Sequence, residues 1–124
     1  MTKAKLVLID DDVEFLEEVR DMLGSSGYQV VCLSDEEYTI EKLRAERPDI
    51  ILLDIKMRIR SGLQIAFEIK RDPMLKYIPI VAMSAVYIEN DVLGMCGIKD
   101  RLMKPFFPAD IIDKVESVLN IAGQ

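Results

Sequence analysis

Four apolar segments of the chain end on polar residues whose side chains can do chemistry. These residues are Asp10, Asp11, Asp54, Ser84 and Lys104. The position of Asp54 is the most unusual for a carboxylate, because Asp54 ends the segment DIILLD directly after four apolar side chains. A carboxylate at the end of a buried segment costs free energy unless a cation or a hydrogen-bond donor pairs with it. Its position therefore indicates either a solvated turn or helix cap, or a reactive group.

Together these side chains fit one kind of chemistry. Clustered carboxylates repel one another, and a cation among them lowers that cost. Oxygen ligands without histidine or thiolate indicate a hard metal such as Mg²⁺, which also accepts phosphate oxygens. An aspartate is a nucleophile toward phosphorus, a serine can donate to a phosphoryl oxygen, and a lysine can neutralise one. The set therefore predicts phosphoryl transfer to Asp54, although each residue alone is also an ordinary cap, turn or surface residue.

The elements that must position these residues alternate between strand and helix. Short apolar runs predict strands at 5–9, 29–33, 49–54, 78–84 and 101–103. Helical spacing predicts helices at 11–24, 34–47, 61–73, 87–97 and 108–121, the fourth of them short and weak. Continuous apolar strands that alternate with helices are typical of a doubly wound α/β domain with a parallel sheet. Right-handed crossovers then bring the carboxyl ends of all strands to one edge, where ligands bind.

Local signals set the expected helix ends and faces. Asp11 or Asp12 is expected to cap the first helix, and Gly24 to end it. Ser34 and Glu37 have capping-box spacing at the start of the second helix. In the third helix, the residues placed at helical spacing are Leu63, Ala66, Phe67 and Lys70.

Composition narrows the class of protein. The 124 residues suit one domain, expected to span 1–124, and 50% hydrophobic with 31% charged residues is an ordinary globular composition. A net charge of −6 without a basic face argues against direct nucleic-acid binding by this segment. No apolar run suits a membrane span or a signal peptide, so we expect a cytoplasmic protein.

Histidine and cysteine content excludes further chemistry. The chain has no histidine, which excludes Ser-His-Asp and Cys-His catalysis and histidine-based zinc sites. Cys32 and Cys96 match no metal or redox spacing and are expected to be small buried apolar residues.

Four segments, LVLIDDD, IILLD, IVAMSA and RLMKPF, resemble the signature segments of bacterial response-regulator receiver domains, the CheY-like family. The resemblance covers essentially the whole chain. It implies a flavodoxin-like sheet of order 2-1-3-4-5 with helices on both faces, and a cis peptide between Lys104 and Pro105. It also implies site roles: phosphoacceptor Asp54, Mg²⁺ ligands Asp10, Asp11 and Asp54 with the backbone carbonyl of Lys56, the hydroxyl of Ser84, and the ammonium of Lys104.

The resemblance also implies the partners. A histidine kinase or a phosphotransfer protein would donate the phosphoryl group, and an output domain or protein would respond to it. Such a domain catalyses only its own phosphorylation and dephosphorylation and is not a turnover enzyme.

Departures from the family pattern are informative. The family usually has Met-Pro where this chain has Met57-Arg58, and often an Asp where it has Ser61. At the family's switch position, usually aromatic, stands Arg101, whose charged head is expected to stay in water. These departures leave open a phosphorylation-independent interaction module. A flavin-binding protein of the same fold is a weaker alternative, because acids replace a glycine-rich phosphate loop after the first strand.

Three basic residues, Lys56, Arg58 and Arg60, closely follow Asp54. They form either a solvated loop or a patch that steers an anionic phosphodonor to the site.

Overall fold

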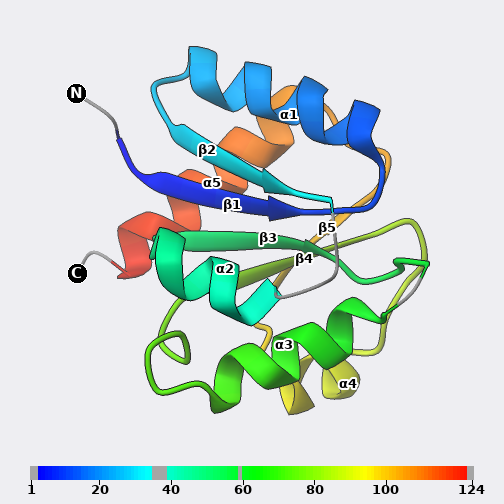
Figure 1. Ribbon diagram of the computed structural model, residues 1–124. Helices are drawn as coiled ribbons and strands as arrows, with labels where there is room; N and C mark the ends of the chain where they lie inside the picture. The colour runs from blue at the N-terminus through cyan, green and yellow to red at the C-terminus, as the bar shows by residue number, and fades with distance from the viewer. Residues whose placement is uncertain (1–2, 35–38, 59, 123–124) are drawn as a thin grey trace.

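The computed structural model of the protein describes residues 3–34, 39–58 and 60–122 (Figure 1). In these ranges, strands and helices alternate along the chain as the sequence predicts. The strands are β1 (Lys5–Ile9), β2 (Gln29–Leu33), β3 (Ile50–Asp54), β4 (Ile80–Ser84) and β5 (Asp100–Met103). The helices are α1 (Val13–Ser25), α2 (Thr39–Glu46), α3 (Gly62–Arg71), α4 (Asn90–Met95) and α5 (Pro108–Ala122).

The five strands form one parallel sheet of order β2-β1-β3-β4-β5. Successive strand residues point to opposite faces, so the sheet separates two apolar layers. Leu6 and Leu8 of β1 pack in the layer covered by α1 and α5. Val7 and Ile9 pack in the layer covered by α2, α3 and α4, on the other side in Figure 1. The predicted doubly wound α/β fold is therefore confirmed.

Helix α1 begins as predicted but ends later. The Asp12 side chain accepts a hydrogen bond from the backbone N–H of Phe15 at 3.2 Å, which confirms a cap at Asp12. The predicted stop at Gly24 is wrong, because α1 continues to Ser25. The chain turns instead at Gly27, whose φ of 96° suits a residue without a side chain. Two glycines lie near this helix end, and local sequence does not decide which one adopts the left-handed conformation.

Of the residues placed at helical spacing in α3, Ala66 lies on the buried face and Phe67 does not. Ile65, Ala66 and Ile69 are fully buried, whereas Phe67 is 48% exposed. Both faces carry apolar residues at helical spacing, so periodicity alone cannot choose between them. Ser61 caps this helix by accepting a hydrogen bond from the N–H of Leu63 at 3.1 Å.

Other predictions met mixed outcomes. The capping box of Ser34 and Glu37 lies partly outside the described residues. Helix α4 is short, as expected, and occupies only the centre of the predicted 87–97. Cys32 and Cys96 are half-buried free thiols rather than core residues. The Lys104-Pro105 peptide is cis, as predicted.

Among the helices of the described residues, none combines the length and apolar character needed to cross a bilayer.

Candidate functional site

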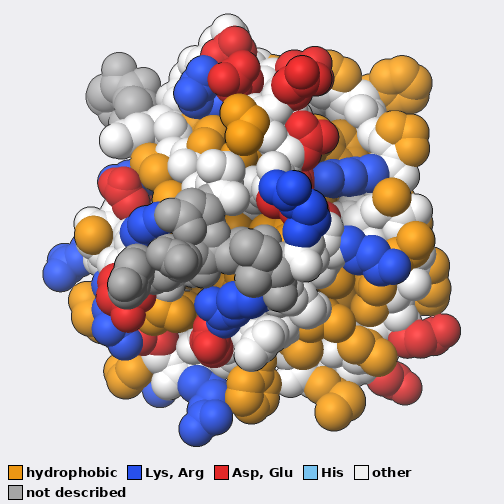
Figure 2. Space-filling view, turned by 45° about the vertical axis from the view of Figure 1, so that its right-hand side comes forward, with side chains coloured by type: hydrophobic (Ala, Val, Ile, Leu, Met, Phe, Trp, Pro, Cys, Tyr) orange, Lys and Arg blue, Asp and Glu red, His pale blue; other side chains and the backbone are white. Residues whose placement is uncertain are grey.

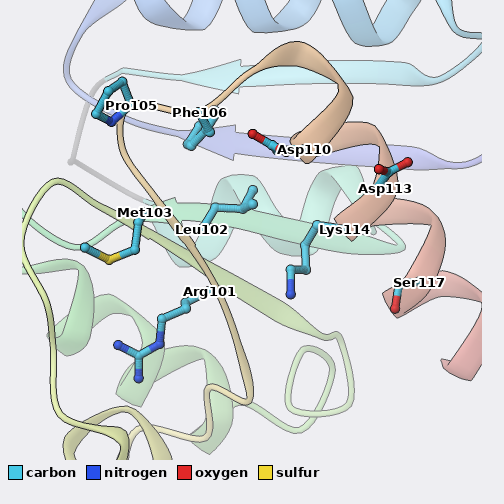
Figure 3. Close-up of a pocket in the computed structure, with 9 residues that line it drawn as sticks. All are labelled: Arg101, Leu102, Met103, Pro105, Phe106, Asp110, Asp113, Lys114 and Ser117. Carbon is cyan, nitrogen blue, oxygen red and sulfur yellow. The ribbon is translucent and has the colours of Figure 1, made fainter.

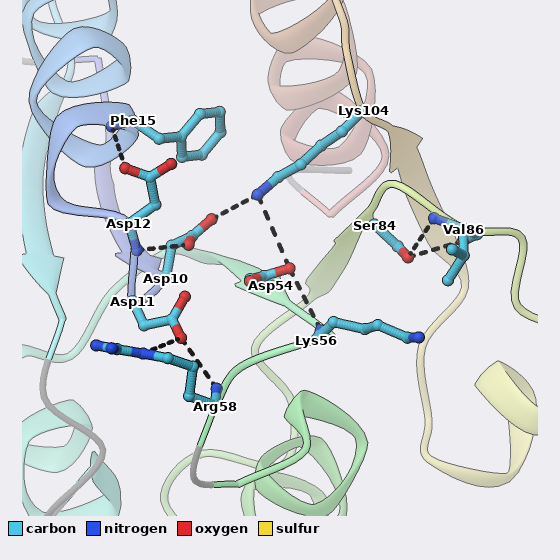
Figure 4. Close-up of polar contacts among 10 residues, drawn as sticks. All are labelled: Asp10, Asp11, Asp12, Phe15, Asp54, Lys56, Arg58, Ser84, Val86 and Lys104. Atoms are coloured by element: carbon cyan, nitrogen blue, oxygen red, sulfur yellow. Dashed lines mark hydrogen bonds and ion pairs between the residues drawn. The ribbon is translucent and has the colours of Figure 1, made fainter.

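The predicted site residues meet at the carboxyl edge of the sheet (Figure 4). Asp54 and Ser84 are the last residues of β3 and β4, Asp10 and Asp11 follow β1, and Lys104 follows β5. Because β1, β3 and β4 are hydrogen-bonded neighbours, their ends bring residues far apart in sequence into one place. The sheet therefore gathers the residues that sequence reasoning selected.

Three carboxylates form the centre of the site. One oxygen from each of Asp10, Asp11 and Asp54 lies within 4.8 Å of the other two. Asp10 is 1% exposed and Asp54 is 5% exposed, whereas Asp11 lies nearer the surface. Such a group of oxygens fits a hard divalent cation, which would offset the mutual repulsion of the carboxylates.

Lys104 supplies a positive charge next to the two buried carboxylates of this cluster, those of Asp10 and Asp54. Its Nζ lies 2.7 Å from Oδ2 of Asp10 and 3.8 Å from Oδ1 of Asp54. The same ammonium lies 4.3 Å from the centre of the Phe15 ring, which shields one side of it from water. Lys104 therefore compensates the most buried acid while remaining next to Asp54.

Backbone groups fix the orientation of the carboxylates. The N–H of Asp12 donates to Oδ1 of Asp10 at 2.9 Å, and the N–H of Lys56 donates to Oδ1 of Asp54 at 3.3 Å. Gly62 packs directly against the end of β3, where a Cβ atom would lie 2.1 Å from the carbonyl oxygen of Asp54. Position 62 therefore requires glycine for this close approach.

The environment raises the pKa of Asp54 to about 6. Burial is the main cause, and the neighbouring charge of Asp10 adds to it. The charge of Lys104 and the hydrogen bond from Lys56 act in the opposite direction but are weaker. The carboxyl of Asp54 thus takes up a proton at a higher pH than an ordinary aspartate does, and added positive charge would favour its ionised form.

Arg58 completes the site in a way that the sequence pattern did not predict. Its backbone N–H donates to Oδ2 of Asp11 at 2.9 Å, and its Nε lies 3.4 Å from the same oxygen. Arg60, two residues further on, pairs instead with Glu68 of α3. The cluster of basic residues was visible in the sequence, but which acid each would meet depends on the path of the loop.

Ser84 lies at the same edge with its hydroxyl turned to its own loop. Its Oγ donates to the carbonyl of Val86 at 2.7 Å and accepts from the N–H of Val86 at 3.1 Å. The Lys56 side chain is exposed and extends away from the carboxylates in Figure 4. Among these residues, the structure therefore joins Asp10, Asp54 and Lys104 most tightly.

The model of the response regulator receiver domain family matches residues 6–116. The chain belongs to this family. The recognition made from the four signature segments is therefore confirmed.

Curated relatives of this receiver domain are transcriptional regulators. The alkaline phosphatase synthesis regulator PhoP of Bacillus subtilis is 30% identical over 117 residues, which are 93% of this chain and 48% of that protein. The phosphate regulon regulator PhoB of Escherichia coli is 31% identical over 117 residues, 93% of this chain and 51% of that protein. The chain thus spans about half the length of these relatives.

Solved structures agree with the fold. The N-terminal domain of a response regulator receiver protein from Methanoculleus marisnigri superimposes with a TM-score of 0.77 at 28% identity, covering 95% of this chain and 98% of that one. The chemotaxis protein CheY4 of Vibrio cholerae gives a TM-score of 0.87 at 23% identity, covering 93% of this chain and 98% of that one. The second likeness shows the shared fold alone.

Arg101 of this receiver domain, whose charged head was predicted to stay in water, is half-buried and ties β5 to the start of α4 and the residues just before it. Its guanidinium donates to the carbonyl of Ile88 and to the side chain of Asn90, and lies 4.8 Å from the centre of the Tyr87 ring. These partners follow β4 in the chain, so local sequence gave no sign of them. The guanidinium thus finds the hydrogen-bond partners that a partly buried charge needs.

The outer face of β5 and α5 carries a pocket of about 460 Å³ (Figure 3). It is lined by Arg101, Leu102, Met103, Pro105, Phe106, Asp110, Asp113, Lys114 and Ser117. In Figure 3 the Arg101 side chain extends away from α5. The lining includes none of the three clustered carboxylates. Figure 2 turns the carboxyl edge of the sheet toward the viewer and shows basic side chains beside acidic ones.

Proposed function

We propose that this receiver domain, residues 1–124, takes a phosphoryl group from a phosphohistidine onto Asp54 with Mg²⁺. The donor is a histidine kinase or a phosphotransfer protein, and the modification changes the surface offered to an output domain or protein. The observation that carries the proposal is the position of Asp54, buried at the end of β3 beside two other carboxylates and 3.8 Å from the ammonium of Lys104. The setting is cytoplasmic, and this segment itself does not bind nucleic acid.

The donor set fits the metal. Asp10, Asp11 and Asp54 supply carboxylate oxygens that lie close enough to share one cation, and family resemblance adds the backbone carbonyl of Lys56. Mg²⁺ prefers such oxygens and leaves positions for phosphate oxygens. When bound, it would supply positive charge to the phosphoryl group as negative charge accumulates there.

The remaining roles belong to side chains of the chain itself. A carboxylate oxygen of Asp54 gives an electron pair to phosphorus, the new O–P bond forms, and the P–N bond to the donor imidazole breaks. The ammonium of Lys104 neutralises a phosphoryl oxygen. Ser84 can donate to another phosphoryl oxygen only after its hydroxyl leaves the carbonyl of Val86. The domain acts on itself and works as a signalling element rather than a turnover enzyme.

Intact-mass measurement after incubation with acetyl phosphate and Mg²⁺ tests the proposal. We expect one added phosphoryl group on the wild type, and none on Asp54→Asn or after chelation of the metal. Asp12→Asn is the matched control, because Asp12 caps α1 and asparagine is an equally good cap. Undiminished phosphorylation of Asp54→Asn would place the modified residue elsewhere.

A second candidate is an interaction module that works without phosphorylation. The contacts of Arg101 with Ile88 and Asn90 favour it, because they hold the segment before α4 in one arrangement without any modification. A wild-type protein that gains no mass in the same experiment, yet is folded, would support this second function.

A further inference from the structure

Asp11 differs from the other two acids of the cluster in its partners. Asp10 is compensated by Lys104 and by the N–H of Asp12, and Asp54 by Lys104 and the N–H of Lys56. Among the residues that the structure describes, both polar partners of Asp11 are atoms of Arg58. Both contacts fall on the same oxygen, Oδ2.

We propose that Arg58 competes with the divalent cation for Asp11 and thereby sets the cation concentration at which the site fills. The inference rests on the proposed metal site and deepens it. In the metal-free domain, the guanidinium of Arg58 neutralises part of the charge that would attract a cation. Cation binding releases the guanidinium, which then lies free at the mouth of the site.

The exposure of Arg58 makes this release easy. Its side chain is 86% exposed, whereas that of Asp11 is only 18% exposed. An exposed guanidinium can leave its partner and regain hydration and rotamer freedom. The ion pair therefore weakens cation binding but does not block it. A buried and rigid ion pair would block it.

The loop around Arg58 holds its backbone in place while the side chain moves. The N–H of Gly62 donates to the carbonyl of Ile55 at 2.8 Å, and Lys56 and Ser61 form a bridge at the base of the loop. The N–H of Arg58 is thus anchored over Asp11 independently of its guanidinium. A proline, which the family pattern usually has at this position, would offer neither the N–H nor the charge.

Calorimetric titration with Mg²⁺ at low ionic strength tests the competition. Arg58→Ala removes the guanidinium and keeps the N–H, so we expect Mg²⁺ binding to tighten roughly twofold to fivefold. Arg58→Lys keeps the charge and should bind nearly as the wild type does. Arg60→Ala is the matched control, because it removes an equal charge that is paired with Glu68. High salt should shrink the effect of Arg58→Ala.

The outcomes separate this inference from the proposed function. Measurable Mg²⁺ binding with equal Kd for the wild type and Arg58→Ala would overturn the competition and leave the metal site intact. Absence of binding in every variant would overturn the metal site and the competition together. An equal gain in Arg60→Ala would show that net charge matters rather than the contact with Asp11.

Discussion

Replacing Asp54 by asparagine should stabilise the metal-free domain at neutral and alkaline pH. The native fold holds the pKa of Asp54 at about 6, above its ordinary value of 3.8. Folding therefore favours the protonated form, and the stability present at low pH is lost as the pH rises through 6. A difference of about 2 pH units corresponds to about 3 kcal/mol. Asparagine has nearly the same shape as the protonated acid and carries no charge at any pH.

Urea unfolding followed by far-ultraviolet circular dichroism measures this effect, with a chelator present. We expect Asp54→Asn to exceed the wild type by up to about 3 kcal/mol at pH 8. The advantage should shrink by roughly 1 to 2 kcal/mol at pH 5, where the wild-type carboxyl is mostly protonated. Added Mg²⁺ should nearly cancel the advantage of Asp54→Asn at pH 8, because a cation at about 100 times its Kd stabilises the wild type by about 2.7 kcal/mol.

Asp72→Asn is the matched control for the sign of the effect. Asp72 is also a buried carboxylate, but the hydrogen bond from Arg44 lowers its pKa. Its ionised form stabilises the fold above its unfolded pKa, so this substitution should destabilise the protein at pH 8. If Asp54→Asn lost stability at pH 8, or gained the same amount at both pH values, the electrostatic reasoning about the cluster would be refuted.

Two further predictions follow from the contacts of the site. Lys104→Met leaves the buried carboxylate of Asp10 without its cation, so the free energy of unfolding in urea at pH 7 should fall by about 2 kcal/mol. An unchanged free energy of unfolding would mean that this ion pair does not stabilise the fold. Arg101→Ala removes the tie to Ile88 and Asn90, so amide hydrogen exchange across residues 88–93 should become several times faster. Equal exchange in both proteins would mean that Arg101 does not hold this segment.

Residue types at strand ends were enough to predict the central part of the site. Asp54 and Ser84 could be placed because apolar strands have clear ends, and a parallel sheet brings those ends to one edge. The same topology places Lys104 at this edge, but its contact with Asp10 could not be predicted, because β3 and β4 lie between β1 and β5 in the sheet. These predictions needed only the order of the elements, which hydrophobic periodicity gives well.

Side-chain pairings outside the strand ends could not be predicted in this way. Arg58 meets Asp11, and Arg101 meets Asn90, through loops whose paths depend on the packed structure. Helical spacing did not identify the buried face of α3, because two faces carry apolar residues, and only packing against the sheet distinguishes Ile69 from Phe67. Local patterns thus determine elements, whereas contacts between loops depend on tertiary geometry.

The closed base of the loop after β3 has a consequence for how such a domain can diversify. The bonds from Gly62 to Ile55 and between Lys56 and Ser61 fix where the loop leaves and rejoins the sheet. Substitutions at the tip, such as at Arg58, therefore change the charge beside the carboxylates without moving Asp54. Under the proposed competition, an exchange at this exposed position would alter cation binding while the fold and the three clustered carboxylates stay unchanged.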